Sequence, residues 1–365
     1  MSRINNEMLV VARQLRQMTQ DDVCLKADIS QGILSKAENG LRELQDDVLN
    51  RLSRVYDLPI SFFYRENDMS PVSHLYFRRK LSLSAKTIDS FVAKSRIIKF
   101  ALDDLFNAVD LPVYDIGTYD PNEFSPQDIA DKIRYKLKVF RGPVPNLTAL
   151  LENHGIVIWK MDFETDKIDG LSTVTNSGQN IIFLNSQMPN DRIRFSLAHE
   201  LGHMIMHMET PPPSVEVAEE QADAFASQFL MPEDEIKPML YNLRMVTLAE
   251  LKRRWNVSMR SLIRRARDLN TISQDTYRYF QIDFSRRKYN KIEPVSLPAE
   301  TPSLVKSTLS LYRDELNYSD EDMLEVMKIN KKDYENWKKK SKEFMDVIRS
   351  DEKTYKEFDE WLDEN

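Results

Sequence analysis

Three of the chain's five histidines lie close together in the sequence, at His199, His203 and His207. The segment around them, 194–208, consists mainly of strong helix formers. On a helix, positions i and i+4 share one face, so His199 and His203 can bind one metal ion. Glu200 is turned about 100° away and can reach water bound to that ion. This His-Glu-x-x-His spacing predicts a hydrolytic metal site.

The donor set predicts zinc as the metal, because Zn²⁺ in hydrolytic sites is bound by two neutral imidazoles and one carboxylate. A fourth position then stays open for water, whose pKa falls to about 7. We expect Glu200 to be the general base that takes the proton of this water as it attacks a peptide carbonyl, and to return the proton to the leaving amine. The expected reaction is hydrolysis of an amide bond.

The third protein ligand is expected on the next helix along the chain. Ser214 can cap this helix at its start, and Glu219 and Asp223 lie one turn apart on it, beside Ala222 and Ala226. Small side chains allow two helices to approach closely, so Glu219 is predicted to reach the metal. Asp223 is predicted to hydrogen-bond one of the ligand histidines and to hold its ring in place.

Other assignments of the ligands are weighed against this one. Glu216 and Glu220 form a rival i, i+4 pair on the second helix, but their face lacks the small residues. His207 lies roughly 12 Å along the helix axis from His199, too far to share an ion. Pairing His207 with His203 leaves no acid in the position of the base. We therefore interpret His207 as a structural or rim histidine and exclude it from the metal.

Two more histidines lie outside this cluster, and the group that stabilises the oxyanion lies outside the motif. His74 and His154 have no ligand-like spacing and are also excluded from the metal. Spacing does not select the group that would stabilise the developing oxyanion, and three candidates stay open: Tyr241, Arg192 and Arg194.

Three runs of β-branched or apolar residues, in 156–159, 171–175 and 180–184, precede the metal helix and predict a small antiparallel sheet. The last run leads directly toward the histidine motif. We expect it to be an edge strand that pairs with an extended peptide and sets the scissile carbonyl beside the metal. The residues of this expected substrate strand are Ile181, Ile182, Phe183, Leu184 and Asn185.

The amino-terminal part of the chain, 7–64, has the pattern of short helices joined by tight turns. Thr19 is expected to cap one helix and Ser30 the next, which ends at Asn39-Gly40. The stretch from Ser30 to Gly40 resembles the XRE/Cro-type helix-turn-helix family, in which the second helix of the motif enters the major groove of DNA. The resemblance implies DNA contacts by Gln31, Gly32, Ser35 and Lys36. A small helical bundle that recognises protein is the alternative interpretation.

Three motifs around the histidines resemble the ImmA/IrrE metallopeptidases. They are Arg192-x-Arg194-Phe195-Ser196-Leu197-Ala198, Glu219-x-x-Ala222-Asp223-x-Phe225-Ala226 and Leu230-Met231-Pro232. The similarity runs from about residue 116 to residue 294, and a helix-turn-helix followed by a peptidase resembles fused members of this family. The resemblance implies a gluzincin-like peptidase that cleaves an XRE-type repressor or otherwise relieves repression, for example in a stress response.

Basic residues are concentrated in two stretches. The first, 73–100, contains a single acid and the bases Arg78, Arg79, Lys80, Lys86, Lys94, Arg96 and Lys99. The second, 248–270, has the pattern of helix, turn and helix, and resembles the family's second helix-turn-helix-like unit. Its bases are Lys252, Arg253, Arg254, Arg260, Arg264, Arg265 and Arg267. Each stretch could contact nucleic acid or form a solvated helix face.

Composition places the chain among globular helical proteins. It has 365 residues, 30% of them charged, a net charge of −7 and no apolar run near the ~20 residues of a membrane span. The start of the sequence lacks an apolar signal core, and Cys24 is the single cysteine. These features predict a cytoplasmic protein without internal disulfides and exclude a thiolate zinc cage.

The predicted fold is α+β, mostly α: an N-terminal helix-turn-helix bundle, a gluzincin-like peptidase domain with a small β-sheet, and a helical C-terminal region. The expected domains are a helix-turn-helix domain at 1–68, a basic helical linker at 69–115, the zinc peptidase domain at 116–240, a helix-turn-helix-like subdomain at 241–295 and a charged helical extension at 296–365.

The expected function is that of a zinc endopeptidase that cleaves a transcriptional repressor, with DNA and a protein substrate as partners. The alternative is a DNA-binding regulator whose peptidase-like domain acts as a sensor or interaction module without proteolysis. Glu200 beside complete metal ligands favours the peptidase, because a sensor has no need of a base. The sequence leaves a homodimer open.

Overall fold

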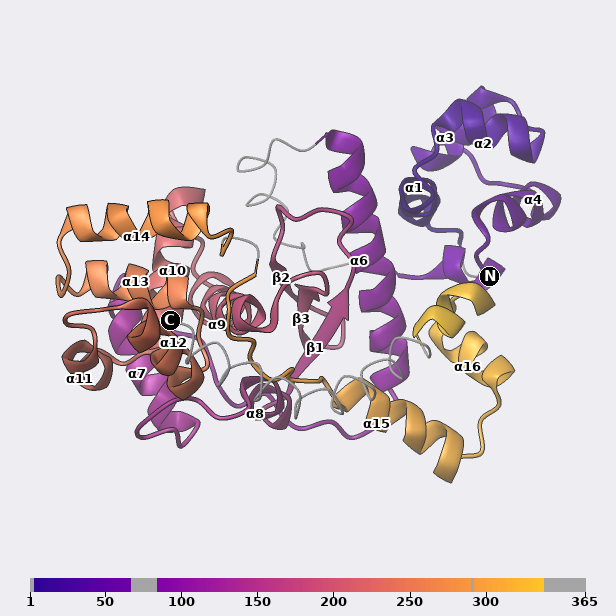
Figure 1. Cartoon of the computed structure of the whole chain (residues 1–365). Helices are drawn as coiled ribbons and strands as arrows, with labels where there is room; N and C mark the ends of the chain where they lie inside the picture. The colour runs from indigo at the N-terminus through magenta and orange to yellow at the C-terminus, as the bar shows by residue number, and fades with distance from the viewer. Residues whose placement is uncertain (1–2, 67–83, 290–291, 338–365) are drawn as a thin grey trace. The chain divides into compact units, whose positions relative to one another are not determined.

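A computed structural model describes residues 3–66, 84–289 and 292–337. This part of the chain is mostly helical with one small three-stranded sheet, which confirms the predicted fold class. It divides into two compact units (Figure 1). The first unit draws on Met1–Leu111, Thr173–Ile181 and Leu304–Lys342, and the second on Pro112–Ser172 and Ile182–Ser303. None of the described helices is both long and apolar enough to cross a bilayer.

Some predictions concern segments outside the described residues. These are the bases Arg78, Arg79 and Lys80 of the expected linker, His74, and the end of the C-terminal extension from residue 338.

The first unit begins with a bundle of short helices: α1 (Asn6–Leu15), α2 (Gln20–Ala27), α3 (Gln31–Glu38), α4 (Asp46–Tyr56) and the 3-10 helix η1 (Ile60–Tyr64). Thr19 caps α2 and forms a capping box with Asp22. Asp28 then adopts a left-handed conformation, with φ of 52°, and Ser30 is the N-cap of α3. The predicted cap at Thr19 is confirmed, whereas Ser30 occupies the N-cap position of α3 without a side-chain hydrogen bond to the first turn.

A chain of polar contacts links the first three helices. Arg13 of α1 donates to both carboxylate oxygens of Glu38, at 2.7 and 2.9 Å. Gln20 of α2 donates to the same carboxylate at 2.7 Å, and Gln31 of α3 donates to Gln20 at 2.9 Å. Glu38 is buried, so these donors compensate its charge. The contacts also hold Gln31 at the start of α3.

Four later elements complete the helices of the first unit: α6 (Ala85–Phe106), α15 (Leu304–Ser310), η3 (Leu311–Glu315) and α16 (Asp320–Met327). α6 packs against α1, α15 and α16. Arg65, which is buried, pairs with Asp104 of α6 at 2.6 Å and donates to the carbonyl of Met327 at 2.7 Å. The amino-terminal bundle and the described carboxy-terminal helices therefore share one unit.

The bases of α6 do not form one solvated face. Lys99 is buried, and Arg96 pairs with Glu7 of α1 at 3.1 Å. Because α6 is packed against several helices, part of its charge lies inside the unit. Ser84 caps α6 by accepting a hydrogen bond from the backbone N–H of Thr87.

One sheet contains β1 (Ile156–Met161), β2 (Gly170–Val174) and β3 (Asn180–Asn185), in the order β1-β3-β2. The sheet is mixed, so the predicted antiparallel arrangement is wrong. The backbone N–H of Ser186, just after β3, donates to the carbonyl of Met161, the last residue of β1, at 2.9 Å. The last residues of β1 and β3 thus lie side by side. The two strands are neighbours in the sheet although β2 lies between them in the sequence.

The strand expected at the edge is the middle strand. β3 has β1 on one side, and on the other side the N–H of Asn185 donates to the carbonyl of Asp169, just before β2, at 2.9 Å. All six residues of β3 are buried. The prediction that Ile181, Ile182, Phe183, Leu184 and Asn185 pair with a substrate is therefore wrong. A continuous apolar run is typical of a strand covered on both faces, and both edges of this one are occupied.

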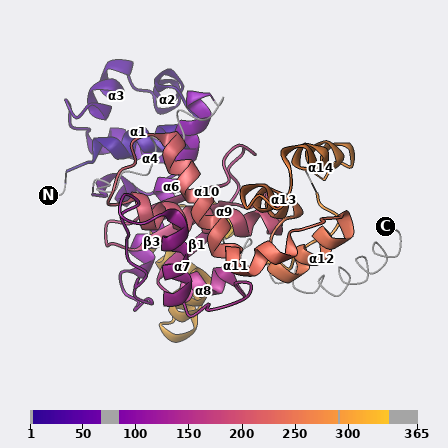
Figure 2. The same ribbon diagram turned by 90° about the vertical axis from the view of Figure 1, so that its left-hand side faces the viewer.

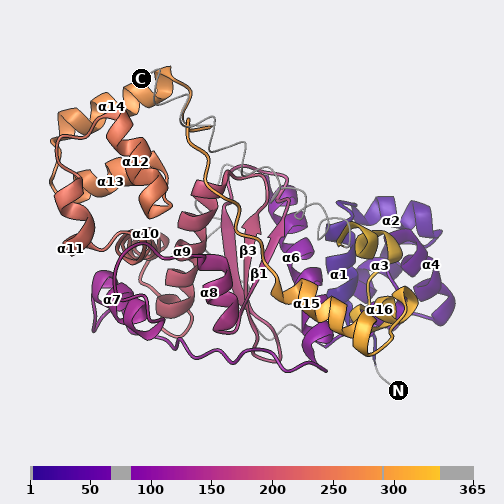
Figure 3. The ribbon, with the colours of Figure 1, turned by 60° about the horizontal axis from the view of Figure 1, so that its bottom comes forward.

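The helices of the second unit are α7 (Pro126–Lys136), α8 (Leu147–Asn153), α9 (Asn190–His207), α10 (Val215–Leu230), α11 (Glu233–Ile236), α12 (Met245–Trp255), α13 (Met259–Asp268) and α14 (Gln274–Arg286), with a 3-10 turn η2 (Lys237–Met239). α10 packs against α9 and α7 (Figures 2 and 3). A Cβ on Gly202 of α9 would lie 3.0 Å from Phe225 and 3.4 Å from the Cα of Ala222. The small residues thus allow the close approach that the sequence predicts.

The start of α9 is held by buried charges. Lys252 of α12 lies 2.5 Å from Asp191 of α9 and 2.8 Å from Glu293. Arg194 of α9 pairs with Glu300. These ion pairs join the segment after α14 to the first turns of α9, so they fix the helix that carries the histidines.

Candidate metal centre

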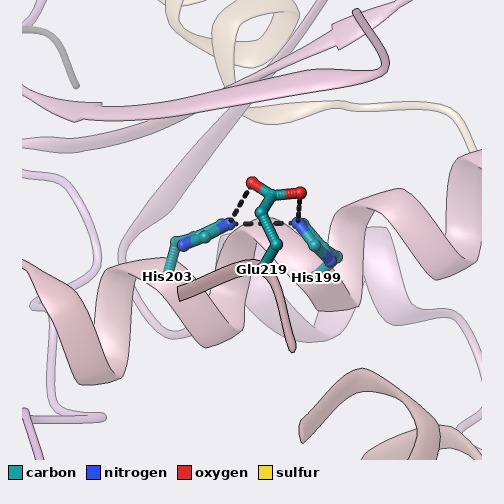
Figure 4. Close-up of side chains that lie close together, drawn as sticks. All are labelled: His199, His203 and Glu219. Atoms are coloured by element: carbon teal, nitrogen blue, oxygen red, sulfur yellow. Dashed lines mark hydrogen bonds and ion pairs between the residues drawn. The ribbon is translucent and has the colours of Figure 1, made fainter. Parts of the chain in front are cut away.

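The three predicted metal ligands come together at one point (Figure 4). His199 and His203 lie one turn apart on α9, and Glu219 reaches them from α10. The carboxylate oxygens of Glu219 lie 3.8 Å from Nε2 of His199 and 3.5 Å from Nε2 of His203, and the two Nε2 atoms are 3.0 Å apart. Among the described residues, this is the one group of His, Cys, Asp and Glu side chains that could hold a metal ion.

The donors fit zinc in kind, and His203 fits it in protonation as well. Two imidazole nitrogens and one carboxylate, with room for a fourth ligand, are typical of hydrolytic zinc sites. Burial lowers the pKa of His203 to about 4, so its ring is neutral near pH 7. A histidine must be neutral to bind a metal. Burial lowers the pKa of His199, but the hydrogen bond to Asp223 and the charges of Glu200 and Asp223 outweigh burial and raise this pKa.

Asp223 orients the ring of His199 from the same helix as Glu219. Its Oδ1 lies 2.9 Å from Nδ1 of His199, and its Oδ2 accepts a hydrogen bond from Arg264 of α13 at 2.8 Å. Burial opposes the charge of Asp223, but the bond from His199 and the charge of Arg264 outweigh it and lower the pKa of the carboxyl. An ionised Asp223 leaves the other ring nitrogen of His199 free for the metal.

His207 supports the second histidine in the same way. Its Nδ1 lies 2.9 Å from Nδ1 of His203, and its Nε2 lies 2.9 Å from Oε1 of Gln221 on α10. His207 is buried. It lies outside the metal-capable group, as the sequence predicts, but it contacts a ligand directly, which the sequence analysis did not anticipate.

Glu200 lies against β2, which is an edge strand of the sheet. A Cβ on Gly170 would lie 2.7 Å from Cγ of Glu200, so only glycine leaves room for this side chain. Burial raises the pKa of Glu200 to about 7; the charge of His199 and hydrogen bonds from the hydroxyl and backbone N–H of Ser172 oppose this rise. A carboxyl that titrates near neutral pH suits a group that both takes and returns a proton.

Sequence reasoning missed Gly170 and Ser172. The chain has only eight glycines, and a glycine at the start of an apolar strand indicates that another group approaches the backbone closely. That indication was available, but it could not name Glu200 as the group.

Comparison with known protein families agrees with this geometry. Residues 151–267 match a peptidase family, M78, whose model is described as the IrrE N-terminal-like domain. The chain carries an IrrE N-terminal-like domain. Residues 11–63 match a family described as helix-turn-helix, so the IrrE-like domain follows an XRE-type helix-turn-helix domain, as the sequence resemblance predicted. A search of curated proteins found no match.

The alternatives weighed for the IrrE-like domain find less support. Glu216 and Glu220 are exposed and lie outside the metal-capable group of the described residues. Arg194 is buried and donates to the carbonyls of Val144 and Pro145 at 2.7 and 2.8 Å. Arg192 binds Asp169 through two hydrogen bonds of 2.8 and 3.0 Å. Both arginines are thus engaged elsewhere, whereas Tyr241, the third oxyanion candidate, is exposed.

The predicted DNA-contacting residues lie on α3. Gln31, Gly32 and Lys36 are exposed, and Ser35 is half-buried. A Cβ on Gly32 would meet no atom within 4 Å. The first turn of α3 therefore presents an open surface next to polar side chains, as a helix that enters a DNA groove requires.

The basic stretch of α12 and α13 is partly internal. Lys252 is buried between two carboxylates, and Arg265 is buried and donates to Gln228 and to the carbonyl of Met231. Arg264 binds Asp223. These bases serve the IrrE-like domain itself, which weakens the interpretation of the whole stretch as a nucleic-acid surface.

Proposed function

We propose that this protein is a zinc endopeptidase that cleaves an XRE-type transcriptional repressor and so relieves repression. The observation that carries the proposal is the convergence of His199, His203 and Glu219 beside the buried Glu200. The match to an IrrE N-terminal-like domain behind a helix-turn-helix supports it. The cytoplasm is the compartment that we propose, because the chain has a single cysteine.

His199, His203 and Glu219 would hold the metal, with Asp223 and His207 keeping the two rings in place. Zinc bound there would supply a Lewis acid that polarises the scissile carbonyl and lowers the pKa of water. Glu200 takes the proton of the attacking water on its carboxylate and delivers it to the leaving amine nitrogen. Ser172 and Gly170 keep this carboxylate against β2, so the base is positioned before substrate arrives.

The two folds divide the work between chemistry and recognition. DNA binding is the role implied by the amino-terminal helix-turn-helix, and we propose Gln31, Gly32, Ser35 and Lys36 as its contacts. We propose five segments: the helix-turn-helix domain 1–68, the basic helical linker 69–115, the zinc peptidase domain 116–240, the helix-turn-helix-like subdomain 241–295 and the charged extension 296–365. We propose that a second domain, in addition to the metal site, selects the repressor.

The test compares proteins cleaved in the presence of the wild type with those cleaved by Glu200→Gln, using mass spectrometry of new chain ends. The amide is nearly isosteric but cannot accept the proton, so this variant should keep the metal and lose cleavage. Glu220→Gln, on the exposed face of α10, is the matched control and should cleave normally. If the wild type produced no chain ends beyond those found with Glu200→Gln, proteolysis through Glu200 would be refuted, and a sensor or interaction module would be the remaining function.

A further inference from the structure

The carboxy-terminal helices of the first unit repeat the local structure of the amino-terminal helix-turn-helix. At the start of α2, Thr19 forms a capping box with Asp22. At the start of α16, Ser319 forms the same box with Asp322. Both helices have eight residues, Gln20–Ala27 and Asp320–Met327. The two helices therefore begin and end at positions that differ by 300 in the numbering, from 20 to 320 and from 27 to 327.

The turns that follow are also alike. α2 ends at Asp28, with φ of 52° and ψ of 55°, and α16 ends at Lys328, with φ of 49° and ψ of 44°. Eleven non-glycine residues of the described chain have a positive φ, and Asn256 ends α12 in the same way, so this turn supports the likeness only together with the caps and the core. An isoleucine follows in both places, and then the N-cap of a second helix: Ser30 in the first, and Asn330, which accepts from the N–H of Asp333 at 2.7 Å, in the second.

The second helix packs on the first through equivalent positions. In the amino-terminal motif the buried residues are Val23, Ala27 and Leu34. In the carboxy-terminal motif they are Met323, Met327 and Tyr334, again at an offset of 300. Residues 331–337 are helical and continue the repeat. Cap, turn and buried positions thus coincide in the two motifs.

In each motif, the second helix exposes residues at equivalent positions. Gln31, Gly32 and Lys36 are exposed on α3, and their counterparts are Lys331, Lys332 and Asn336, all exposed. Ser35 is half-buried, whereas Glu335 is exposed. This face carries no apolar side chain, which argues against a protein partner, since the centre of a protein interface is apolar.

The carboxy-terminal motif is attached to the amino-terminal bundle by its other residues. Arg65 donates to the carbonyl of Met327 at 2.7 Å, and Asn330 donates to the carbonyl of Asp57 at 2.7 Å. Arg16 lies 3.9 Å from Asp333. These contacts use the turn and the inner side of the second helix, so they leave Lys331, Lys332 and Asn336 exposed within the unit.

We propose that residues 319–337 are a second helix-turn-helix motif and that Lys331, Lys332 and Asn336 contact duplex DNA. Lysine ammonium groups neutralise phosphates, and an asparagine amide can pair with the edge of adenine. The carboxy-terminal motif is the more acidic of the two: α16 carries Asp320, Glu321, Asp322 and Glu325 where α2 carries Asp21 and Asp22, and Glu335 takes the place of Ser35. We therefore place the DNA contact of this motif at Lys331, Lys332 and Asn336 alone. The proposal adds a second contact to the DNA binding already proposed for α3.

The test measures binding of the full chain to a fluorescent mixed-sequence duplex of about 30 bp, long enough for two half-sites. Lys331→Ala/Lys332→Ala should lower the salt dependence of binding by about two units of log K per log salt, and weaken binding about tenfold or more at low salt. The control Lys306→Ala/Arg313→Ala removes the same charge from exposed positions of α15 and η3 and should change neither.

A third variant, Gln31→Ala/Lys36→Ala, separates the two motifs. Loss of binding in this variant with an unchanged Lys331→Ala/Lys332→Ala would overturn the second motif and leave the first. If Lys306→Ala/Arg313→Ala weakened binding as much, the effect would come from net charge alone, and the second motif would also be overturned. If the wild type bound no duplex, or bound single-stranded RNA more tightly, DNA contact by both motifs would be refuted. Thermal unfolding of each variant checks that the unit stays folded.

Discussion

The close contact between β2 and Glu200 makes Gly170→Ala a sharp test of the proposed base. The added Cβ would lie 2.7 Å from Cγ and 2.9 Å from Oε1 of Glu200. Ordinary contact between such atoms begins near 3.5 Å, so the Glu200 side chain must move by about 1 Å. The atoms that must move belong to the end of a side chain, which can rotate, so the fold itself should tolerate the change.

A displacement of about 1 Å at a reacting group can cost roughly 100-fold in rate. We therefore expect kcat for a peptide substrate to fall about 100-fold, which corresponds to about 2.7 kcal/mol in the barrier. Stability should change little, because the loss of unfolded-chain entropy from Gly to Ala favours the folded state by roughly 0.4–1 kcal/mol and offsets local strain. Metal content should be unchanged, because the three atoms nearest to a Cβ on Gly170 all belong to Glu200 and none to a metal ligand.

The assay combines three measurements on wild type and Gly170→Ala: zinc content after dialysis, thermal unfolding, and cleavage of a substrate found in the Glu200→Gln experiment. Gly202→Ala gives the contrast, because its Cβ would lie 3.0 Å from Phe225 and would press on the contact between α9 and α10. It should weaken metal binding, whereas Gly170→Ala should not. Wild-type kcat in Gly170→Ala with zinc bound would refute the argument that Glu200 must stay at its place beside β2.

Two further predictions follow from buried side chains. His207→Ala removes the partner of Nδ1 of His203 and should weaken zinc binding about 10–100-fold in a competition titration, as loss of such a partner does elsewhere; His154→Ala, on an exposed pair with Asp115, should leave zinc affinity unchanged. Burial lowers the pKa of Lys160 from 10.5 to about 8, against the charge of Glu152. Between these pH values the folded state holds fewer protons than the unfolded one, so the unfolding free energy of wild type should rise with pH relative to Lys160→Met, by at most roughly 3 kcal/mol. Parallel urea-unfolding curves for the two proteins from pH 8 to 10.5 would contradict this.

Local features of this protein could be predicted from its sequence, because they depend on residues within one or two helical turns. On any helix, His199 and His203 share a face, whatever the rest of the chain does. The position of Glu200 relative to them is determined by the same helical geometry. Caps at Thr19 and Ser214 act on the next few N–H groups, and both lie where they are predicted. The approach of Glu219 depended on one further local feature, the alanines beside it.

Strand order could not be predicted, because pairing joins segments that are distant in the sequence. The same apolar run at Ile181–Asn185 fits an edge or a middle strand, and only β1 and β2 on its two sides show that it is the middle one. The contact of Gly170 with Glu200 depends on that order. The burial of Lys252 and Arg265 could not be predicted from the sequence either. A base on a helix gives the same sequence pattern whether its face meets solvent or a carboxylate of another segment.

The carboxy-terminal motif lies between these cases. Its cap at Ser319 and its isoleucine after Lys328 are present in the sequence, but large residues, Met323, Met327 and Tyr334, replace the smaller ones of the amino-terminal motif. What the sequence did not reveal is the backbone: a left-handed Lys328, which turns the chain as Asp28 does. That conformation costs a lysine roughly 1 kcal/mol or more, so it persists only because the packing of both helices, visible in the tertiary structure alone, holds it there.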